Sequence, residues 1–207
     1  MLFAALSVFL LVRAQLLTVN TVAAPAPEDL APAIKAQLQT TGTKVTFGGS
    51  TVEIWWANAV AVTAPGEGWS NVESGTLVGA VRVTGSFKEI RGKVVKPGVY
   101  TLRHGQQPQN GDHLGISPFR EFLLLSPAAV DREVKVAGFD GAVALSKQTI
   151  GTSHPASLSL DPPEEAPGAV LSGYKNESGH DGVVFEIKQS GGATIKFGLI
   201  LIGLIVH

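Results

Sequence analysis

The chain has 207 residues, of which 44% are hydrophobic, and it carries 24 glycines, 12 prolines and no cysteine, so one well-packed domain without disulfides or thiolate chemistry is expected. Sixteen Lys and Arg residues against 17 Asp and Glu residues give a formal net charge of -1, which offers no positive field for nucleic acid or an anionic membrane surface.

The first element is the apolar run Leu2 to Val12, which has the length of a signal-peptide core and falls short of the roughly 20 residues that a membrane-spanning helix needs. Small residues place the cleavage site after Ala14, with Ala24 as the alternative. Residues 1–14 are therefore predicted to be a signal peptide of an exported protein, periplasmic or extracellular, with no transmembrane helix. No Lys or Arg precedes the run, so a buried N-terminal element is the other interpretation.

Residues 15–42 are predicted to form a linker followed by one short helix. Between Glu28 and Gln39, apolar side chains recur at Leu30, Ile34 and Leu38, the spacing of one helical face.

From residue 43 to 207 the hydrophobic period changes to two, which predicts strands. Alternating residues include Val52, Ile54 and Trp56, then later Val183, Phe185 and Ile187. The run Phe122–Leu125 is apolar throughout, as in a strand covered on both faces. The expected fold is mainly β, a single β-sandwich or jelly-roll-like domain with one or two short peripheral helices.

Two later segments complete this domain. Residues 139–148 have the pattern of a second helix, with Gly151 beyond its end. The apolar stretch Phe197 to Val206 is too short to span a bilayer as a helix, so we expect a central strand that closes the sheet.

The sequence contains no G-x-S-x-G, H-E-x-x-H, P-loop or G-x-G-x-x-G motif. Common serine and zinc hydrolases, P-loop enzymes and Rossmann dehydrogenases are therefore disfavoured, and the chain is expected not to be an enzyme of these classes.

Five polar residues near predicted strand ends could bind a divalent metal if their loops converged: Asp112, His113, His154, His180 and Asp181. The alternative is that Asn110–Asp112 is turn chemistry, that the histidines lie on the surface or cap elements, and that there is no cofactor.

Three further residues are candidates for ligand binding. Trp69 lies in a Gly-rich loop, where an exposed indole could stack on a sugar ring or instead fold back as a lid on the core. Glu53, beside Trp55, faces either solvent or a polar pocket, and Arg120 could pair with a carboxylate such as Glu53 or Asp112.

The stretches KPGVYTLR (96–103), NGDHLGISPFREFLLL (110–125) and GTSHPASLSL (151–160) resemble an uncharacterised family of exported bacterial β-domain proteins with a Pro-Gly-x-Tyr-x-Leu strand motif. The resemblance implies an exported β-domain and brings no activity or catalytic residue with it.

These observations favour a non-catalytic protein that binds a small molecule, a glycan or a protein partner. One alternative is a metal-binding protein or metal-dependent enzyme that uses the loop His and Asp residues. Another is an envelope-associated structural protein that assembles through its C-terminal strand.

Overall fold

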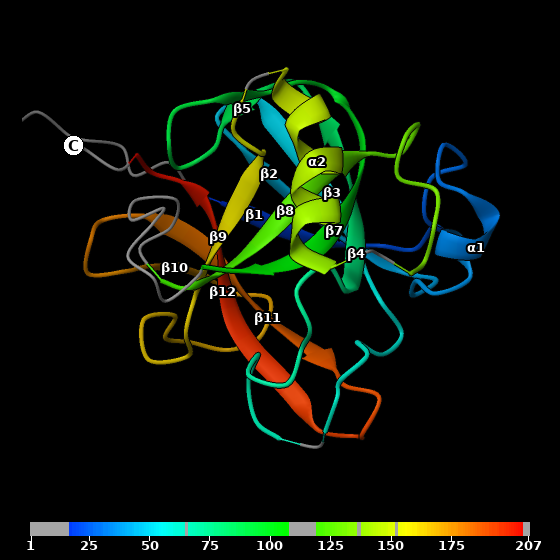
Figure 1. Cartoon of the computed structure of the whole chain (residues 1–207). Helices are drawn as coiled ribbons and strands as arrows, with labels where there is room; N and C mark the ends of the chain where they lie inside the picture. The colour runs from blue at the N-terminus through cyan, green and yellow to red at the C-terminus, as the bar shows by residue number, and fades with distance from the viewer. Residues whose placement is uncertain (1–16, 65, 108–118, 136–137, 152, 205–207) are drawn as a thin grey trace, which may run out of the picture.

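The computed structural model of the protein describes residues 17–64, 66–107, 119–135, 138–151 and 153–204. Strands dominate it, and two helices lie outside the main sheet (Figure 1). The mainly β, single-domain fold predicted from the sequence is confirmed.

The first seven strands and the first helix are β1 (Thr18–Val22), α1 (Pro32–Lys35), β2 (Gly42–Phe47), β3 (Ser50–Trp56), β4 (Leu77–Thr84), β5 (Phe87–Lys88), β6 (Val94–Val95) and β7 (Gly98–Gln106). The remaining elements are β8 (Glu121–Pro127), α2 (Gly138–Ile150), β9 (Ser157–Asp161), β10 (Gly173–Lys175), β11 (Asp181–Lys188) and β12 (Thr194–Ile202).

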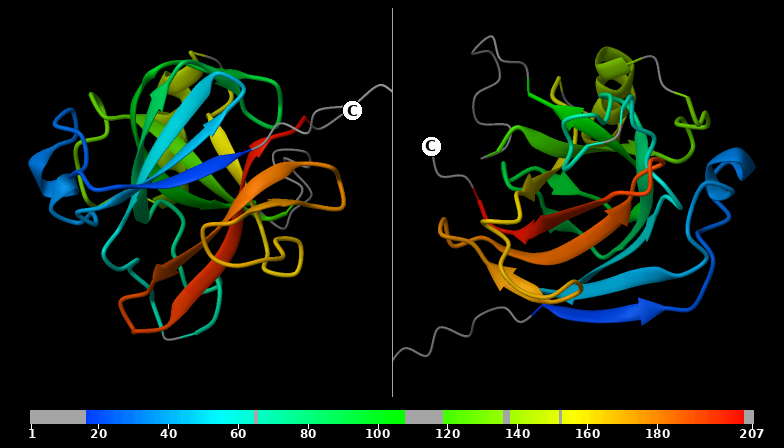
Figure 2. Two further views of the ribbon diagram at one scale, coloured as in Figure 1. Left: turned by 180° about the vertical axis from the view of Figure 1, so that it is seen from behind. Right: turned by 90° about the horizontal axis from the view of Figure 1, so that it is seen from below.

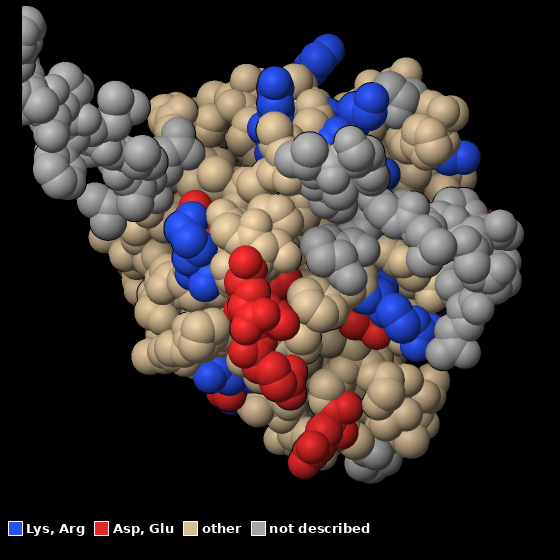
Figure 3. Space-filling view, turned by 90° about the vertical axis from the view of Figure 1, so that its left-hand side faces the viewer, with Lys and Arg blue, Asp and Glu red and all other residues tan. Residues whose placement is uncertain are grey.

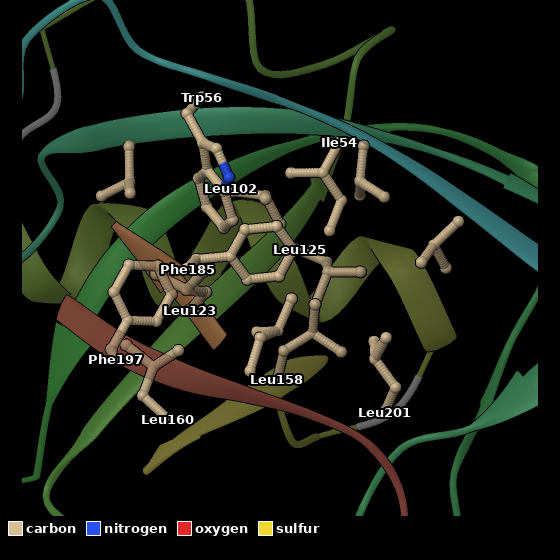
Figure 4. Packing of buried hydrophobic residues seen from close by; sticks show 14 of the residues in the cluster. Ile54, Trp56, Leu102, Leu123, Leu125, Leu158, Leu160, Phe185, Phe197 and Leu201 are labelled. Atoms are coloured by element: carbon tan, nitrogen blue, oxygen red, sulfur yellow. The ribbon is translucent and has the colours of Figure 1, made fainter. Parts of the chain in front are cut away.

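Ten strands form one antiparallel sheet in the order β1-β2-β3-β4-β7-β8-β9-β12-β11-β10, and β5 pairs with β6 separately. Rings from distant strands of this sheet meet in the core, because Trp56 of β3 lies 5.0 Å from Phe185 of β11 and 5.4 Å from Phe197 of β12 between ring centroids. The sheet therefore curls until its two halves face each other across the core (Figures 2 and 4). The two layers expected of a sandwich are halves of one continuous sheet.

The predicted alternation decides which side chains enter this core. On β11, Val183, Phe185 and Ile187 are buried in it, whereas Glu186 and Lys188 are exposed. The continuous apolar run on β8 is covered on both faces, as predicted: Leu123 and Leu125 join the main core, and Phe122 and Leu124 pack under α2.

The N-terminal helix is shorter than the predicted span from Glu28 to Gln39. It begins at Pro32, because proline suits the first helical position and disfavours helical geometry in the residue before it. The apolar positions were nevertheless identified correctly, since Leu30, Ile34 and Leu38 are all buried in a second cluster around Trp55.

The C-terminal strand β12 lies between β9 and β11, which confirms the predicted central strand. Its pairing with β11 extends along most of both strands, and Gly198 and Leu199 also pair with β9. Within the described part of the chain, no helix is both long and apolar enough to cross a membrane.

Candidate functional site

A pocket of about 740 Å³ opens where the starts of β8 and β12, the end of β9 and the loop around Trp69 meet. Its apolar wall consists of Trp69, Phe119, Leu160, Pro162, Pro163 and Ala193. Its charged lining consists of Glu67, Arg120, Glu121, Asp161, Glu164 and Lys196. Acidic side chains also gather visibly on the face of the molecule shown in Figure 3.

Trp69 contributes to this pocket from a largely buried position. Its side chain is folded back on the core, where its ring stacks on His104 at 5.1 Å with an interplanar angle of 4°. Its ring also makes an edge-to-face contact with Phe197, with ring centroids 5.2 Å apart. Of the two alternatives for this loop tryptophan, the lid on the core is the one found, and the exposed stacking platform is not.

Glu121, the first residue of β8, presents a carboxylate that two neighbours hold in place. Its Oε2 lies 2.6 Å from Nε2 of His104, and its Oε1 accepts a hydrogen bond of 2.8 Å from Nε2 of Gln106. Both neighbours come from β7, which pairs with β8 so that Gln106 lies opposite Glu121. The side chain of Glu121 keeps 21% of its surface exposed and lines the pocket.

The partners of His104 fix its role. The ring is fully buried, and its Nδ1 has no hydrogen-bond partner among the described residues. A buried N–H without an acceptor is costly, so the favoured tautomer carries its proton on Nε2 and donates it to Glu121. His104 therefore supports a pocket carboxylate from behind and does not face the pocket itself.

Asp161, the last residue of β9, lies in the wall of the same pocket and is 1% exposed. Its Oδ2 accepts hydrogen bonds from the hydroxyl of Tyr174 at 2.7 Å and from the amide of Asn176 at 2.9 Å. Its Oδ1 has no partner among the described residues. One oxygen of this carboxyl group therefore has two donors, and the other has none among the described residues.

Burial raises the pKa values of both Asp161 and Tyr174. Removal from water raises the pKa of Asp161, and the hydrogen bonds from Tyr174 and Asn176 and the nearby His180 only partly oppose that shift. Burial also raises the pKa of Tyr174, and the hydrogen bond to Asp161 adds to the effect. Tyr174 therefore stays a hydrogen-bond donor toward Asp161.

The two cations of the lining are directed toward backbone carbonyl groups. Nη2 of Arg120 donates to the carbonyl oxygen of Gln107 at 3.3 Å, and Nζ of Lys196 donates to that of Gly168 at 3.0 Å. Arg120 and Trp69, two of the residues predicted to bind a ligand, both line this pocket.

Glu53 lies elsewhere and does not pair with Arg120. It sits on β3 opposite Arg82 of β4, and Nη1 of Arg82 lies 3.5 Å from its Oε2. The guanidinium carbon of Arg82 is 5.8 Å from the ring centroid of Trp55. Glu53 therefore belongs to an outer-face pair over Trp55 and not to the pocket.

Three of the five predicted metal ligands, His154, His180 and Asp181, lie within the described residues. His154 is exposed, whereas His180 is buried and its backbone N–H donates to Oδ1 of Asn176. Asp181 accepts a hydrogen bond of 2.7 Å from Nζ of Lys175. Asp112 and His113 lie outside the described residues. Within the described residues, no three His, Asp or Glu side chains are placed to hold one metal ion.

Sequence reasoning missed the pocket carboxyl groups of Glu121 and Asp161, and it missed His104, which holds Glu121 from behind. A weak signal exists for Asp161, because it ends a strand of alternating Ser and Leu directly before the Pro-rich loop. No local signal identifies the His104–Glu121 pair, since the two residues meet only through the pairing of β7 with β8.

No protein-family model matches this chain, and no curated protein or solved structure matches it either.

Proposed function

We propose that the protein is a non-catalytic binding protein that holds a small organic molecule in the pocket between β8, β9 and β12. The observation that carries the proposal is the combination of an apolar wall with a carboxylate, Glu121, that is fixed from behind by two side chains. Small-molecule sites in proteins typically enclose about 300–1,000 Å³, with mostly apolar walls and a few oriented polar groups.

The fixed carboxylate favours binding because its position is set before a ligand arrives. A polar group that is already ordered loses little conformational entropy on binding, so more of the interaction energy appears as affinity. The stack of Trp69 on His104 adds to this order, since it limits the rotation of the imidazole that holds Glu121.

The arrangement of His104 supports binding over covalent catalysis. An activating histidine would accept a proton from a nucleophile that faces the substrate. His104 is buried and gives its hydrogen bond to Glu121, so its observed contact orients a carboxylate.

A screen of a diverse small-molecule library by thermal shift tests this proposal when it is repeated on a blocked pocket. Thr194 is an exposed strand residue that lines the pocket, so Thr194→Trp is expected to fill it and abolish the shifts given by true ligands. Thr21→Trp is the matched control, because Thr21 is also an exposed strand residue but lies on β1, away from the pocket. Ligands that bind both variants equally would overturn the proposal.

Export is proposed as the setting of this activity, on the strength of the apolar run at Leu2 to Val12. The fold supports cleavage after Ala14 over cleavage after Ala24, because β1 pairs with β2 along residues 18–22. The carbonyl of Ala24 also accepts a hydrogen bond from the indole of Trp55 at 2.8 Å. Determining the N-terminal residue of protein secreted by an expressing bacterium tests this, with Gln15 expected.

A further inference from the structure

Positive charge is concentrated in the β5–β6 hairpin, the segment of residues 85–97 that connects β4 to β7. Its one carboxylate is Glu89, and its four cations are Lys88, Arg91, Lys93 and Lys96. Glu89 is buried, and its Oε2 accepts a hydrogen bond of 2.9 Å from Nε of Arg91, so these two charges compensate each other. The three lysines are exposed and make no ion pair with any described residue. The net charge of -1 therefore hides a local positive field at this hairpin.

The register of the hairpin separates a buried face from an outer face. Phe87 lies opposite Val95, and Lys88 lies opposite Val94. Successive strand residues point to opposite faces, and residues directly opposite each other share a face. Phe87 and Val95 are buried in the main core, so Lys88 and Val94 lie together on the outer face. A valine that is 47% exposed therefore stands directly beside an unpaired lysine.

Leu204 adds a second exposed apolar side chain at the same place. It lines a cleft of about 390 Å³ together with Phe87 and Lys88. Its Cδ2 also lies 3.7 Å from the position that a Cβ on Gly92 would take. Leu204 at 50% and Val94 at 47% are the two most exposed large hydrophobic residues in the described part of the chain. The hairpin thus combines exposed apolar side chains with unpaired positive charge.

The hairpin and the pocket lie at opposite ends of the molecule. In Figure 1, β5 is at the top, whereas the start of β12, which lines the pocket, is at the bottom. Lys and Arg side chains gather in the uppermost part of Figure 3, where no Asp or Glu is visible, and most of the visible Asp and Glu lie lower. A surface that bound the hairpin would therefore leave the pocket end free.

We infer that the β5–β6 hairpin binds the surface of an anionic lipid membrane. Lysines near such a surface are attracted to its negative headgroups, and exposed apolar side chains among them insert at the boundary with the acyl chains. A soluble polyanion would use the lysines but would leave Val94 and Leu204 in water, so the lipid surface accounts for more of the patch. This inference goes beyond the proposed binding function and does not depend on it.

Co-sedimentation with vesicles at millimolar lipid tests the inference. The protein is expected to bind vesicles of phosphatidylglycerol and not those of phosphatidylcholine, and about 0.5 M NaCl should release it, because salt screens exposed charges. Replacing Lys88, Lys93 and Lys96 together by Gln should weaken binding by at least about 10-fold, since each lysine at an anionic surface strengthens binding roughly 5-fold. The matched control replaces three exposed lysines outside the hairpin, Lys135, Lys175 and Lys188, and should bind like the unchanged protein.

A second pair of variants tests the apolar contribution. Val94→Thr keeps the branched shape that suits a strand and is expected to weaken binding to phosphatidylglycerol several-fold. Val170→Thr is its control, because Val170 is 45% exposed but lies outside the hairpin, and it should have no effect. The apolar run Leu2 to Val12, if it is retained, is common to all variants and cannot produce a difference between them.

Three results would overturn the inference. The first is absence of binding to phosphatidylglycerol, and the second is an equal loss of binding in the two lysine variants. The third is binding to soluble polyglutamate as tight as to the vesicles, with Val94→Thr without effect, which would assign the hairpin to an acidic macromolecule. None of these results bears on the pocket, because the thermal-shift screen with Thr194→Trp tests that site separately.

Discussion

Nε2 of His104 lies 2.6 Å from Oε2 of Glu121, and the imidazole of His104 stacks at the same time on Trp69. The pair connects the main core to the pocket, because His104 is fully buried whereas Glu121 is partly exposed. The core thus sets the position of a carboxylate that a ligand can reach.

Replacing His104 by Phe separates the packing role of this residue from its hydrogen bond. Phe can still stack on Trp69, and it removes a buried Nδ1 that has no partner among the described residues, so the free energy of unfolding should change by less than about 1.5 kcal/mol. Glu121 loses one of its two holding contacts, so we expect the affinity for a pocket ligand to fall several-fold. Urea unfolding and ligand titration on one preparation measure both quantities. An unchanged affinity would show that His104 does not orient Glu121.

Asp161→Asn should stabilise the protein at neutral pH. Asn keeps an acceptor for Tyr174 and Asn176 but carries no charge to bury, whereas burial of Asp161 raises its pKa above the usual 3.8. The stabilisation by protonated Asp161 is fully present below pH 3.8 and is lost as the pH rises through the folded-state pKa.

The gain in the free energy of unfolding from Asp161→Asn should therefore nearly vanish near pH 3.5 and grow as the pH rises. Its upper limit is about 1.4 kcal/mol for each unit by which folding raises the pKa of Asp161. Melting temperatures of both proteins between pH 3.5 and 7.5 measure it. Tyr174, His180 and Glu165 are the titratable neighbours of this network, and all three are present in both proteins. A difference in melting temperature that does not vary with pH would contradict the raised pKa of Asp161 as its cause.

Gly198→Ala should disturb the hydrogen bond between Tyr174 and Asp161. A Cβ at position 198 would lie 2.5 Å from Cζ of Tyr174 and would also clash with its hydroxyl oxygen, so the ring must move. We expect a loss of about 1–3 kcal/mol in stability, typical of overpacking. Gly173→Ala is the matched control, because its Cβ would meet no atom closer than 3.8 Å. Equal losses in the two variants, measured by urea unfolding, would rule out the steric explanation.

The buried pair Arg103–Asp131 should be far more important for stability than the partly exposed pair Arg82–Glu53. Arg103 donates to both oxygens of Asp131, at 2.6 and 2.7 Å, and the two side chains are 0% and 1% exposed. Asp131→Ala leaves a buried guanidinium uncompensated, so we expect a loss of about 3–5 kcal/mol. Glu53→Gln is the control and should cost less than about 1 kcal/mol, because Arg82 is 43% exposed. Similar costs for the two variants in urea unfolding would contradict this ranking.

The strands could be predicted from the sequence because their signal is local. Alternation along Val183, Phe185 and Ile187 reflects which side chains enter the core, and those residues are buried as expected. The curl of the sheet could not be predicted, because it depends on contacts such as that between Trp56 and Phe197, on strands far apart in the sequence.

The same physical reason separates the predicted site residues from those found. Trp69 and Arg120 could be singled out because a loop tryptophan and a charge before an apolar strand are visible locally. The partners of Glu121 could not, since they depend on the register that sets Gln106 opposite it. Asp161 gains its buried environment from Tyr174, across a long loop, so its own segment gives only a weak sign of it.

The NMR signals of the tryptophan indole N–H groups test the central claim most directly. Trp69 lines the pocket, whereas the indole of Trp55 is bound to the carbonyl of Ala24 in the second cluster. With signals assigned by Trp69→Phe and Trp55→Phe, a ligand from the library screen is expected to shift the Trp69 signal in a saturable manner and leave that of Trp55 in place. A saturating ligand that shifts only the Trp55 signal, or neither signal, would contradict binding in this pocket.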